Sequence, residues 1–180
     1  GTYLLSKLAK KIQVKHFIYT SSVAVYGTKK KENKMNEKSK INPDSIYGIS
    51  KYTGEMFINQ ILEETKIKTK IFRIFNTYGP GEDLNYLKKG MVSIYSSYVW
   101  RNKPIIVKGS LKRFRNYQYI GDVVKILVNS INNTKLNKNE IFNLTTGKVT
   151  KVSELLHLIM KVSGKNLKII QKKSTQGDSF

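Results

Sequence analysis

The sequence predicts an α/β fold in which buried strands pair in parallel. Apolar residues recur at helical spacing from Tyr3 to Ile12, and the unbroken run His16–Thr20 that follows is typical of a buried parallel strand. A second strand is expected at 69–75, after a long segment with helical periodicity. Because helices alternate with strands along the chain, neighbouring strands are expected to be parallel.

The segments after residue 27 continue this alternation. We expect a lysine-rich loop at 28–43, followed by a long helix over about 45–64 that Asp44 or Ser45 caps. The core face of that helix is predicted to consist of Ile46, Ile49, Thr53, Met56, Phe57 and Ile61. Further elements are expected as a helix at 87–100, strands at 105–107 and 117–119, a helix at 121–131, a strand at 141–144 and a helix at 152–162.

Length and composition are those of one ordinary globular domain. The chain has 180 residues, 39% hydrophobic and 25% charged, which is enough to bury a core. It has no apolar run of about 18 residues and no signal-peptide pattern at its start, so we expect a cytoplasmic protein with no membrane partner. The absence of cysteine excludes thiolate catalysis and cysteine-ligated metals, and two histidines are too few for a histidine-built site. No metal is therefore expected.

The net charge of +21 and the pI near 10 are typical of nucleic-acid-binding proteins. Only four of the 33 basic residues are arginine, however, and the lysines are scattered through a chain that is also rich in asparagine and isoleucine. The lysine run 29–31 falls in an expected loop, where a run of charges is usually a solvated surface. We expect no nucleic-acid partner, and a basic nucleic-acid module remains an alternative.

A candidate pair of reactive side chains is Tyr47 and Lys51. Four-residue spacing on a helix places the phenol and the ammonium on one face, about one turn apart. The spacing alone is weak evidence, because chance supplies about two such pairs in a chain of this composition. A packing role for Tyr47 is the alternative.

Two further segments are expected to meet this pair. The first strand runs into Ser21 and Ser22, and the second strand runs into the segment 73–80. The carboxyl ends of parallel strands lie at one edge of a sheet, where open α/β sheets bind their ligands. Three separate segments are therefore expected to converge on one crevice.

Four motifs in order now support a family resemblance. They are Ser-Ser-x-x-Val-Tyr-Gly at 21–27, Tyr-x-x-x-Lys at 47–51, Arg-x-x-Asn-x-Tyr-Gly-Pro at 73–80 and Arg-Asn-Tyr-Gln-Tyr-Ile-Gly-Asp-Val at 115–123. The sequence resembles the extended short-chain dehydrogenases/reductases that act on nucleotide sugars, the NAD-dependent epimerase/dehydratase family. The resemblance covers essentially the whole chain. It implies that 1–80 is the second half of the NAD-binding, Rossmann-type domain with its catalytic residues, and that 81–180 is mainly a small α/β substrate-binding portion, interleaved with the core.

The chemistry implied by the resemblance is oxidation of a sugar hydroxyl, with NAD as the hydride acceptor. A tyrosine with the ordinary pKa near 10 is a poor base at neutral pH. The charge of Lys51, the oxidised nicotinamide and the amino end of the helix would together favour the phenolate of Tyr47. The resemblance also assigns Lys51 to the cofactor ribose and Ser22 to the sugar hydroxyl, so Ser22, Tyr47 and Lys51 are the expected catalytic residues. A turn-forming role is the alternative for Ser22.

The resemblance assigns binding residues as well. For the cofactor they are Thr20, Ser21, Tyr47, Lys51 and Phe75, and for the nucleotide-diphosphate sugar they are Ser22, Asn76, Gly90, Met91 and Arg115. Arg115 is expected to grip a phosphate bidentately, with a surface salt bridge as its alternative. The amide of Asn76 faces the substrate diphosphate or else bonds its own loop. Arg113 lies on the same side as Arg115 if the segment is extended.

Two departures from the family pattern guide the choice of reaction. Dehydratases of the family place Asp-Glu after the turn hydroxyl, whereas this chain has Val23 and Ala24, so elimination lacks its acid and base. The glycine-rich segment that holds the cofactor pyrophosphate is absent from the sequence, and the chain begins at what resembles the helix before the catalytic-serine strand. We expect a nucleotide-sugar 4-epimerase mechanism. The alternatives are a dehydratase or reductase of the same family and an inactive sugar-nucleotide-binding fragment.

A homodimer is expected for the full-length protein. The helices at 2–12 and 45–64 carry apolar residues on more than one face, and Tyr52 and Ile58 are predicted to lie outside the core stripe of the second helix. In the family that the chain resembles, the corresponding helices pair across a two-fold axis into a four-helix bundle.

Overall fold

The computed structural model describes residues 1–27, 35–87, 90–132 and 139–173, so the lysine run 29–31 and the last residues of the chain lie outside the described part. The chain divides into two compact units. Unit 1 consists of 1–75 and 123–144, and unit 2 consists of 76–122 and 145–180. The sequence suggested a boundary at residue 80 between a cofactor-binding part and a mainly substrate-binding part. That boundary concerns function, and both roles stay predictions.

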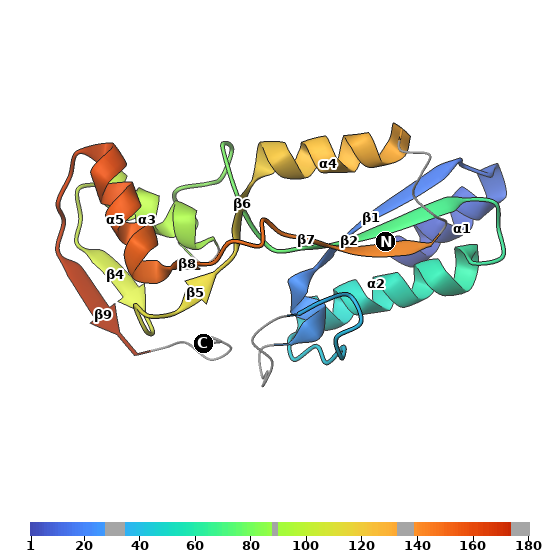
Figure 1. Ribbon diagram of the computed structural model, residues 1–180, viewed down its shortest axis with the longest axis horizontal. Coiled ribbons are helices and arrows are strands. Elements are labelled where there is room, and N and C mark those ends of the chain that lie inside the picture. The colour runs from blue at the N-terminus through green and yellow to red at the C-terminus, as the bar shows by residue number, and fades with distance from the viewer. Residues whose placement is uncertain (28–34, 88–89, 133–138, 174–180) are drawn as a thin grey trace. The chain divides into compact units, whose positions relative to one another are not determined.

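Unit 1 is built on a parallel sheet. Strands β1 (His16–Ser22), β2 (Lys68–Ile74) and β7 (Glu140–Leu144) lie in the order β1-β2-β7, and both pairs are parallel. Helices α1 (Thr2–Ile12) and α2 (Ile46–Leu62) lie on one face of this sheet, and α4 (Ile120–Asn132) lies on the other (Figure 1). The predicted α/β fold with parallel pairing is therefore confirmed, with element bounds that move by a few residues.

The core of unit 1 has one cluster on each face of the sheet. On the α2 face it contains Ile58, Leu62, Ile67 and Ile71. On the α4 face it contains Phe72, Val123 and Leu144, and the Phe72 ring stacks on Phe142 with centroids 5.4 Å apart. A sheet covered on both faces explains the consecutive apolar residues within its strands, such as Ile71 and Phe72 in β2.

The predicted core face of α2 was wrong at four of its six positions, whereas Ile61 does pack against the core. Ile46, Ile49, Met56 and Phe57 are exposed, whereas the buried positions are Gly48, Gly54, Glu55, Ile58 and Leu62. Hydrophobic periodicity missed this face because two of its members are glycines and one is a carboxylate that is neutralised by an ion pair. Ile58, predicted to lie outside the core, is 0% exposed, and Tyr52 is partly buried. The cap of α2 is Ser45, whose Oγ accepts a hydrogen bond of 3.0 Å from the Gly48 N–H.

Helix α1 uses its small residues for packing. Ser6 and Ala9 are buried, whereas Leu4, Leu5 and Leu8 are more than one third exposed. The exposed surface of α1 and α2 in unit 1 therefore carries several large apolar side chains among its lysine and amide residues.

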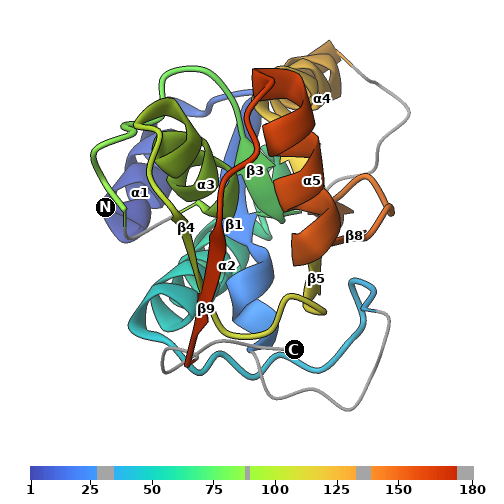
Figure 2. The same cartoon turned by 90° about the vertical axis from the view of Figure 1, so that its left-hand side faces the viewer.

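Unit 2 has its own core, between two helices and a strand pair. Strands β4 (Ile105–Lys108) and β9 (Ile169–Lys172) pair in parallel, and α3 (Met91–Trp100) and α5 (Val152–Ser163) lie beside them (Figure 2). The fully buried members of this core include Ile105, Val107, Val152 and Leu156. Strand β9 was not predicted from the sequence.

Four shorter strands complete unit 2. β3 (Asn76–Tyr78) pairs in parallel with β6 (Tyr117–Tyr119), and β5 (Phe114–Arg115) pairs antiparallel with β8 (Thr150–Lys151). A 3₁₀ helix, η1 (Val23–Tyr26), follows β1 in unit 1. None of the helices in the described part of the chain is long and apolar enough to cross a membrane.

We predict that Ile58→Ala lowers the free energy of unfolding by about 2 to 5 kcal/mol, because it removes a fully buried side chain from the unit 1 core. Ile49→Ala on the same helix is the matched control, since Ile49 is 51% exposed, and its cost should stay within about 0.5 kcal/mol. Urea unfolding of the full-length protein measures both. Equal losses would show that α2 presents a different face to the sheet.

Candidate active site

The carboxyl end of β1 carries three predicted site residues, Thr20, Ser21 and Ser22. The Ser22 Oγ accepts a hydrogen bond of 3.2 Å from the Ala24 N–H and so caps η1. A hydroxyl that accepts one bond still has its own hydrogen to donate. Ser22 therefore combines the turn-forming role with the ability to donate to a ligand.

Tyr47 and Lys51 lie one turn apart on α2, as their spacing requires. Tyr47 belongs to the first turn of the helix and is 54% exposed. The Lys51 Nζ lies 5.7 Å from the centroid of the Tyr47 ring. The ammonium and the phenol are therefore neighbours at the amino end of α2.

Close packing of α2 against β1 brings these side chains to the strand end. The Lys51 Nζ donates to the Thr20 carbonyl at 2.7 Å, and a Cβ on Gly48 would come within 2.5 Å of the Ala24 carbonyl oxygen. Gly48 follows Tyr47 in the chain, and Ala24 is the residue that bonds Ser22. Ser22, Tyr47 and Lys51 therefore gather at one edge of unit 1.

A buried ionic cluster lies beneath this edge, and sequence reasoning missed it. Glu55 and Arg73 form an ion pair of 2.7 Å, and the Ser21 Oγ donates to Glu55 at 2.5 Å. The Ser21 side chain, predicted to bind the cofactor, is thus turned into the protein. The signals were an acid four residues after Lys51 and an arginine inside an apolar strand.

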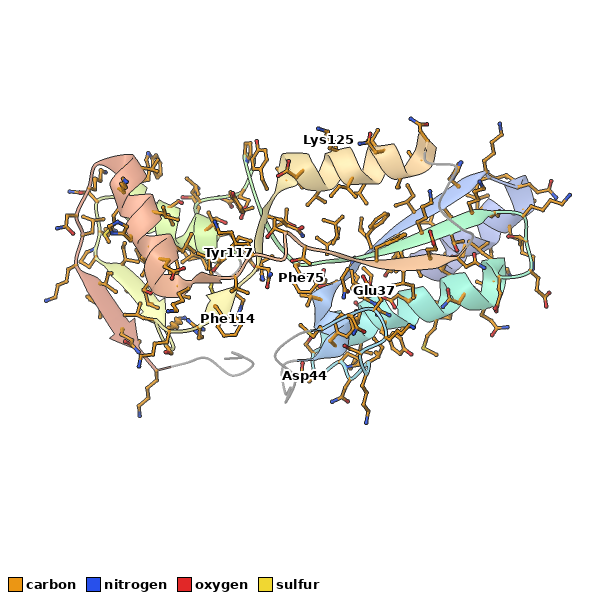
Figure 3. The ribbon with its side chains drawn as sticks, in the orientation of Figure 1. Glu37, Asp44, Phe75, Phe114, Tyr117 and Lys125 are labelled. Carbon is orange, nitrogen blue, oxygen red and sulfur yellow. The ribbon has the colours of Figure 1, made fainter. Side chains whose placement is uncertain are left out.

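Parts of an NAD site fit these residues. The ammonium of Lys51 and the phenol of Tyr47 are hydrogen-bond donors suited to ribose hydroxyls. Thr20 contributes a backbone carbonyl that already accepts from Lys51, and Phe75, labelled in Figure 3, follows β2 with its N–H bonded to the Leu144 carbonyl at 3.2 Å. The residues suit the ribose and nicotinamide end of the cofactor, and the sequence carries no glycine-rich segment for the pyrophosphate.

Unit 2 contains a cavity of about 650 Å³. The predicted substrate residues Asn76, Gly90 and Met91 line it, and Arg115 does not. Its wall also includes Glu82, Lys108 and Tyr117, to which sequence reasoning gave no binding role, and Arg113, which it placed only beside Arg115. The cavity has the size and the mixed apolar and polar lining of a small-molecule site.

The two arginines that flank Phe114 differ in their placement. Arg113 is 4% exposed, and its guanidinium donates to the carbonyls of Lys108 and Ser110, the latter at 2.9 Å. Arg115 lies on β5 and donates to the Phe114 carbonyl at 2.8 Å. Arg113 therefore braces the turn after β4, while the Arg115 guanidinium lies outside the cavity wall.

Tyr117 lies in the cavity wall, and both arginines act electrostatically on its phenol. Burial raises the pKa of its phenol to about 12, and Tyr95 adds to this rise, while Arg115 and Arg113 act against it. The phenol is therefore neutral at physiological pH, and it donates to the Met91 Sδ at 3.3 Å. Both guanidinium groups lie within electrostatic reach of this wall of the cavity.

The amino end of α3 also borders the cavity. Gly90 has φ of +76°, and a Cβ there would lie 2.6 Å from the Ser93 Oγ and 2.8 Å from a Glu82 oxygen. Glycine is therefore required where the chain enters α3, and this explains why the helix begins at Met91 and not near residue 87.

The sequence matches one known protein family over most of its length. Residues 1–145 match the profile of a family described as the NAD dependent epimerase/dehydratase family. The chain belongs to this family. Among the described residues, no group of three or more histidine, aspartate or glutamate side chains is placed to hold a metal ion.

Individual relatives agree with this assignment. A Methanocaldococcus jannaschii protein whose name assigns it provisionally to UDP-glucose 4-epimerase is 33% identical across 100% of this chain and 57% of its own length. The human dTDP-D-glucose 4,6-dehydratase is 29% identical over 92% of this chain and 47% of its own length. The chain therefore spans about half the length of the curated relatives it matches.

A solved structure supports the fold of both units. The UDP-glucose 4-epimerase of Thermotoga maritima, determined with UDP-glucose, superposes with a TM-score of 0.89 at 30% identity. The match covers 98% of this chain and 56% of that chain. The predicted Rossmann-type α/β fold of a nucleotide-sugar epimerase/dehydratase is thus confirmed.

Proposed function

We propose that this chain is the part of an NAD-dependent nucleotide-sugar 4-epimerase that carries the catalytic residues. The observation that carries the proposal is the placement of Tyr47 and Lys51 on one face of α2, packed against the strand end that bears Ser22. A base, a cation and a hydroxyl in one place suit the deprotonation of a sugar hydroxyl. Family membership and the UDP-glucose 4-epimerase relatives support the same function.

In the proposed mechanism, Tyr47 removes the proton of the C4 hydroxyl. Held by Lys51 and Tyr47, a bound NAD would supply reversible hydride acceptance at that carbon, which would allow return of the hydride to the other face of the keto sugar. Lys51 keeps the phenolate accessible and binds the cofactor ribose, while Ser22 donates to the sugar oxygen. Partial exposure of Tyr47 leaves its phenol available to a substrate.

The nucleotide part of the substrate is assigned to the unit 2 cavity. Asn76 and the entry to α3 at Gly90 and Met91 line it, and Tyr117 supplies an aromatic wall. Arg115 lies two residues before Tyr117 of the cavity wall, and it is assigned to the diphosphate because a guanidinium can bind a phosphate bidentately. Arg113 is already bonded to two backbone carbonyls and is assigned a structural role.

Epimerisation is preferred over elimination because of the two residues after Ser22. Val23 and Ala24 begin η1 and supply neither an acid nor a base, although a dehydratase is among the relatives. Product analysis of the full-length protein distinguishes the two reactions. A 4-keto-6-deoxy sugar among the products would overturn the choice of epimerase.

We predict that Tyr47→Phe in the full-length protein lowers turnover at least about 100-fold, because it removes the proton acceptor alone. Binding of UDP-glucose should remain close to that of the wild type, since the ring and its packing are retained. Steady-state kinetics and calorimetric binding measure the two quantities. Wild-type turnover in this variant would refute the role of Tyr47.

We also predict that Arg115→Ala weakens UDP-glucose binding at least about tenfold, because a charge-assisted phosphate contact is lost. The control is replacement of Lys29, Lys30 and Lys31 by serine, which should leave the affinity nearly unchanged because exposed charges are screened. These lysines lie outside the described residues. The opposite pattern, with loss only in the lysine variant, would favour the basic surface as the binding element.

We further propose that the full-length protein is a homodimer through α1 and α2. Leu8 of α1 is 50% exposed and Met56 of α2 is 54% exposed, on helices that pack against each other on one face of the sheet. An apolar surface over two adjacent helices suits a four-helix interface between two copies. Ile58 cannot report on this interface because it is buried in the core.

Changing both Leu8 and Met56 to glutamate should convert the dimer to a monomer, as measured by light scattering on the full-length protein. The control is Val162→Glu, because Val162 is 88% exposed on α5 in unit 2. The control should remain dimeric. A double variant that keeps the dimer would exclude this surface as the interface.

A further inference from the structure

Glu55 continues the line of Tyr47 and Lys51 along α2. The three residues are spaced four apart, so they share one face of the helix, which turns toward the end of β1. Unlike the other two, Glu55 is almost fully buried, with 1% of its surface exposed. A carboxylate therefore lies one turn from the lysine whose charge the proposed mechanism uses.

Arg73 binds this carboxylate through two of its guanidinium nitrogens. The Arg73 Nε donates to one Glu55 oxygen at 3.1 Å, and Nη2 donates to the other at 2.7 Å. This is the bidentate geometry that makes arginine–carboxylate pairs strong and directional. Burial alone would disfavour the charged guanidinium, but its bonds to Glu55 and Tyr26 outweigh burial and raise the pKa of Arg73.

Further contacts fix the direction of the pair. The Arg73 Nη1 donates to the Tyr26 hydroxyl at 2.9 Å and to the carbonyl of Glu37, labelled in Figure 3, at 3.2 Å. Ser21 donates to the Glu55 oxygen that Arg73 Nε also contacts. Glu55 is thus directed toward β1 and β2, with its charge balanced inside the protein.

Lys51 is left with a different partner. Its Nζ donates to the Thr20 carbonyl, a neutral group one residue before Ser21. A lysine and a glutamate four residues apart on a helix are neighbours and attract each other, although less strongly in this order than with the glutamate first. Without Arg73, Glu55 would be the nearest anion for Lys51 on the same helix face.

We propose that Arg73 is a positioning residue that holds Glu55 away from Lys51, so that the lysine charge acts on Tyr47 and the cofactor. The inference rests on the proposed function, because it assumes that Tyr47 must ionise. An unpaired carboxylate one helical turn from Lys51 would offset part of the positive field of the lysine at Tyr47, and pairing with Arg73 prevents this. Arg73 thus takes part in the chemistry without touching the substrate.

None of the other titratable groups on the elements around Tyr47 takes the place of the Glu55–Arg73 pair in this arrangement. Tyr19 of β1 is partly buried, and burial raises the pKa of its phenol, with Glu55 and Tyr47 adding to the rise against a hydrogen bond from Thr2. The Tyr19 phenol is therefore uncharged at neutral pH. Tyr26 of η1 and Glu37 contact Arg73 itself, and Asp44 precedes the cap of α2.

The test is a spectroscopic titration of Tyr47 in full-length protein with NAD added. Tyrosinate absorbance is recorded for each background with and without Tyr47→Phe, and the difference follows Tyr47 alone. The backgrounds are wild type, Arg73→Met, Glu55→Gln and the double variant. Lys70→Met is the matched control, because Lys70 is a buried cation on the same strand whose side chain bonds the Ser130 carbonyl of α4.

The expected shifts have opposite signs. Arg73→Met should raise the midpoint by about 0.5 to 1 pH unit, because the freed carboxylate offsets Lys51, and Glu55→Gln should lower it, because Arg73 is left unbalanced. The double variant and Lys70→Met should titrate near the wild type. A merely structural role predicts losses of stability without opposite shifts that cancel.

The outcomes separate this inference from the proposed function. A midpoint that is unchanged in both single variants, or shifted in the same direction in both, overturns the inference. If Arg73→Met does not fold, Glu55→Gln decides alone, because its amide keeps the shape of the carboxylate, and an unchanged midpoint there is a refutation. The titration needs no turnover, so a protein without epimerase activity would refute the proposed function and leave this readout intact.

Discussion

The close contact between α2 and β1 is the constraint on which the rest of unit 1 depends. Gly48 lies against the Ala24 carbonyl of η1 and Gly54 against the Tyr19 phenol of β1, and neither position has room for a Cβ, so α2 packs closely on both elements. At that separation, Lys51 reaches the Thr20 carbonyl and Glu55 reaches the Ser21 hydroxyl. The position of Tyr47 follows from these contacts, because it occupies the same helix face one turn earlier.

This contact also explains why a charged pair lies in the core of unit 1. The face of α2 that approaches β1 closely cannot carry large apolar side chains near its start, and Glu55 and Arg73 take their place beneath the strand end. A buried ion pair contributes less to stability than an apolar pair of the same volume. Its position beneath the edge where Ser22, Tyr47 and Lys51 gather fits a role in arranging charge.

Unit 2 combines a core of its own with a cavity. Its core is formed by α3, α5 and the β4–β9 pair, and the cavity opens beside that core. The Arg113 guanidinium donates to the carbonyls of Lys108 and Ser110 and so closes the turn after β4. Gly90 lets the chain enter α3 beside Glu82. The cavity is thus shaped by backbone turns, while aromatic and amide side chains supply its chemistry.

The sequence by itself determined the α/β class, the order of the major elements and the segments that carry Ser22, Tyr47, Lys51 and Asn76. These features are local, because helical spacing, buried apolar runs and contiguous motifs depend on neighbours along the chain. The tertiary structure alone decided which face of α2 is buried, since Gly48 and Glu55 carry no apolar signal and Ile58 does not differ from Ile49 as a residue type. It also decided the pairing of Glu55 with Arg73 and the separate placement of Arg113 and Arg115, because these depend on strand register and turn geometry between residues distant in sequence.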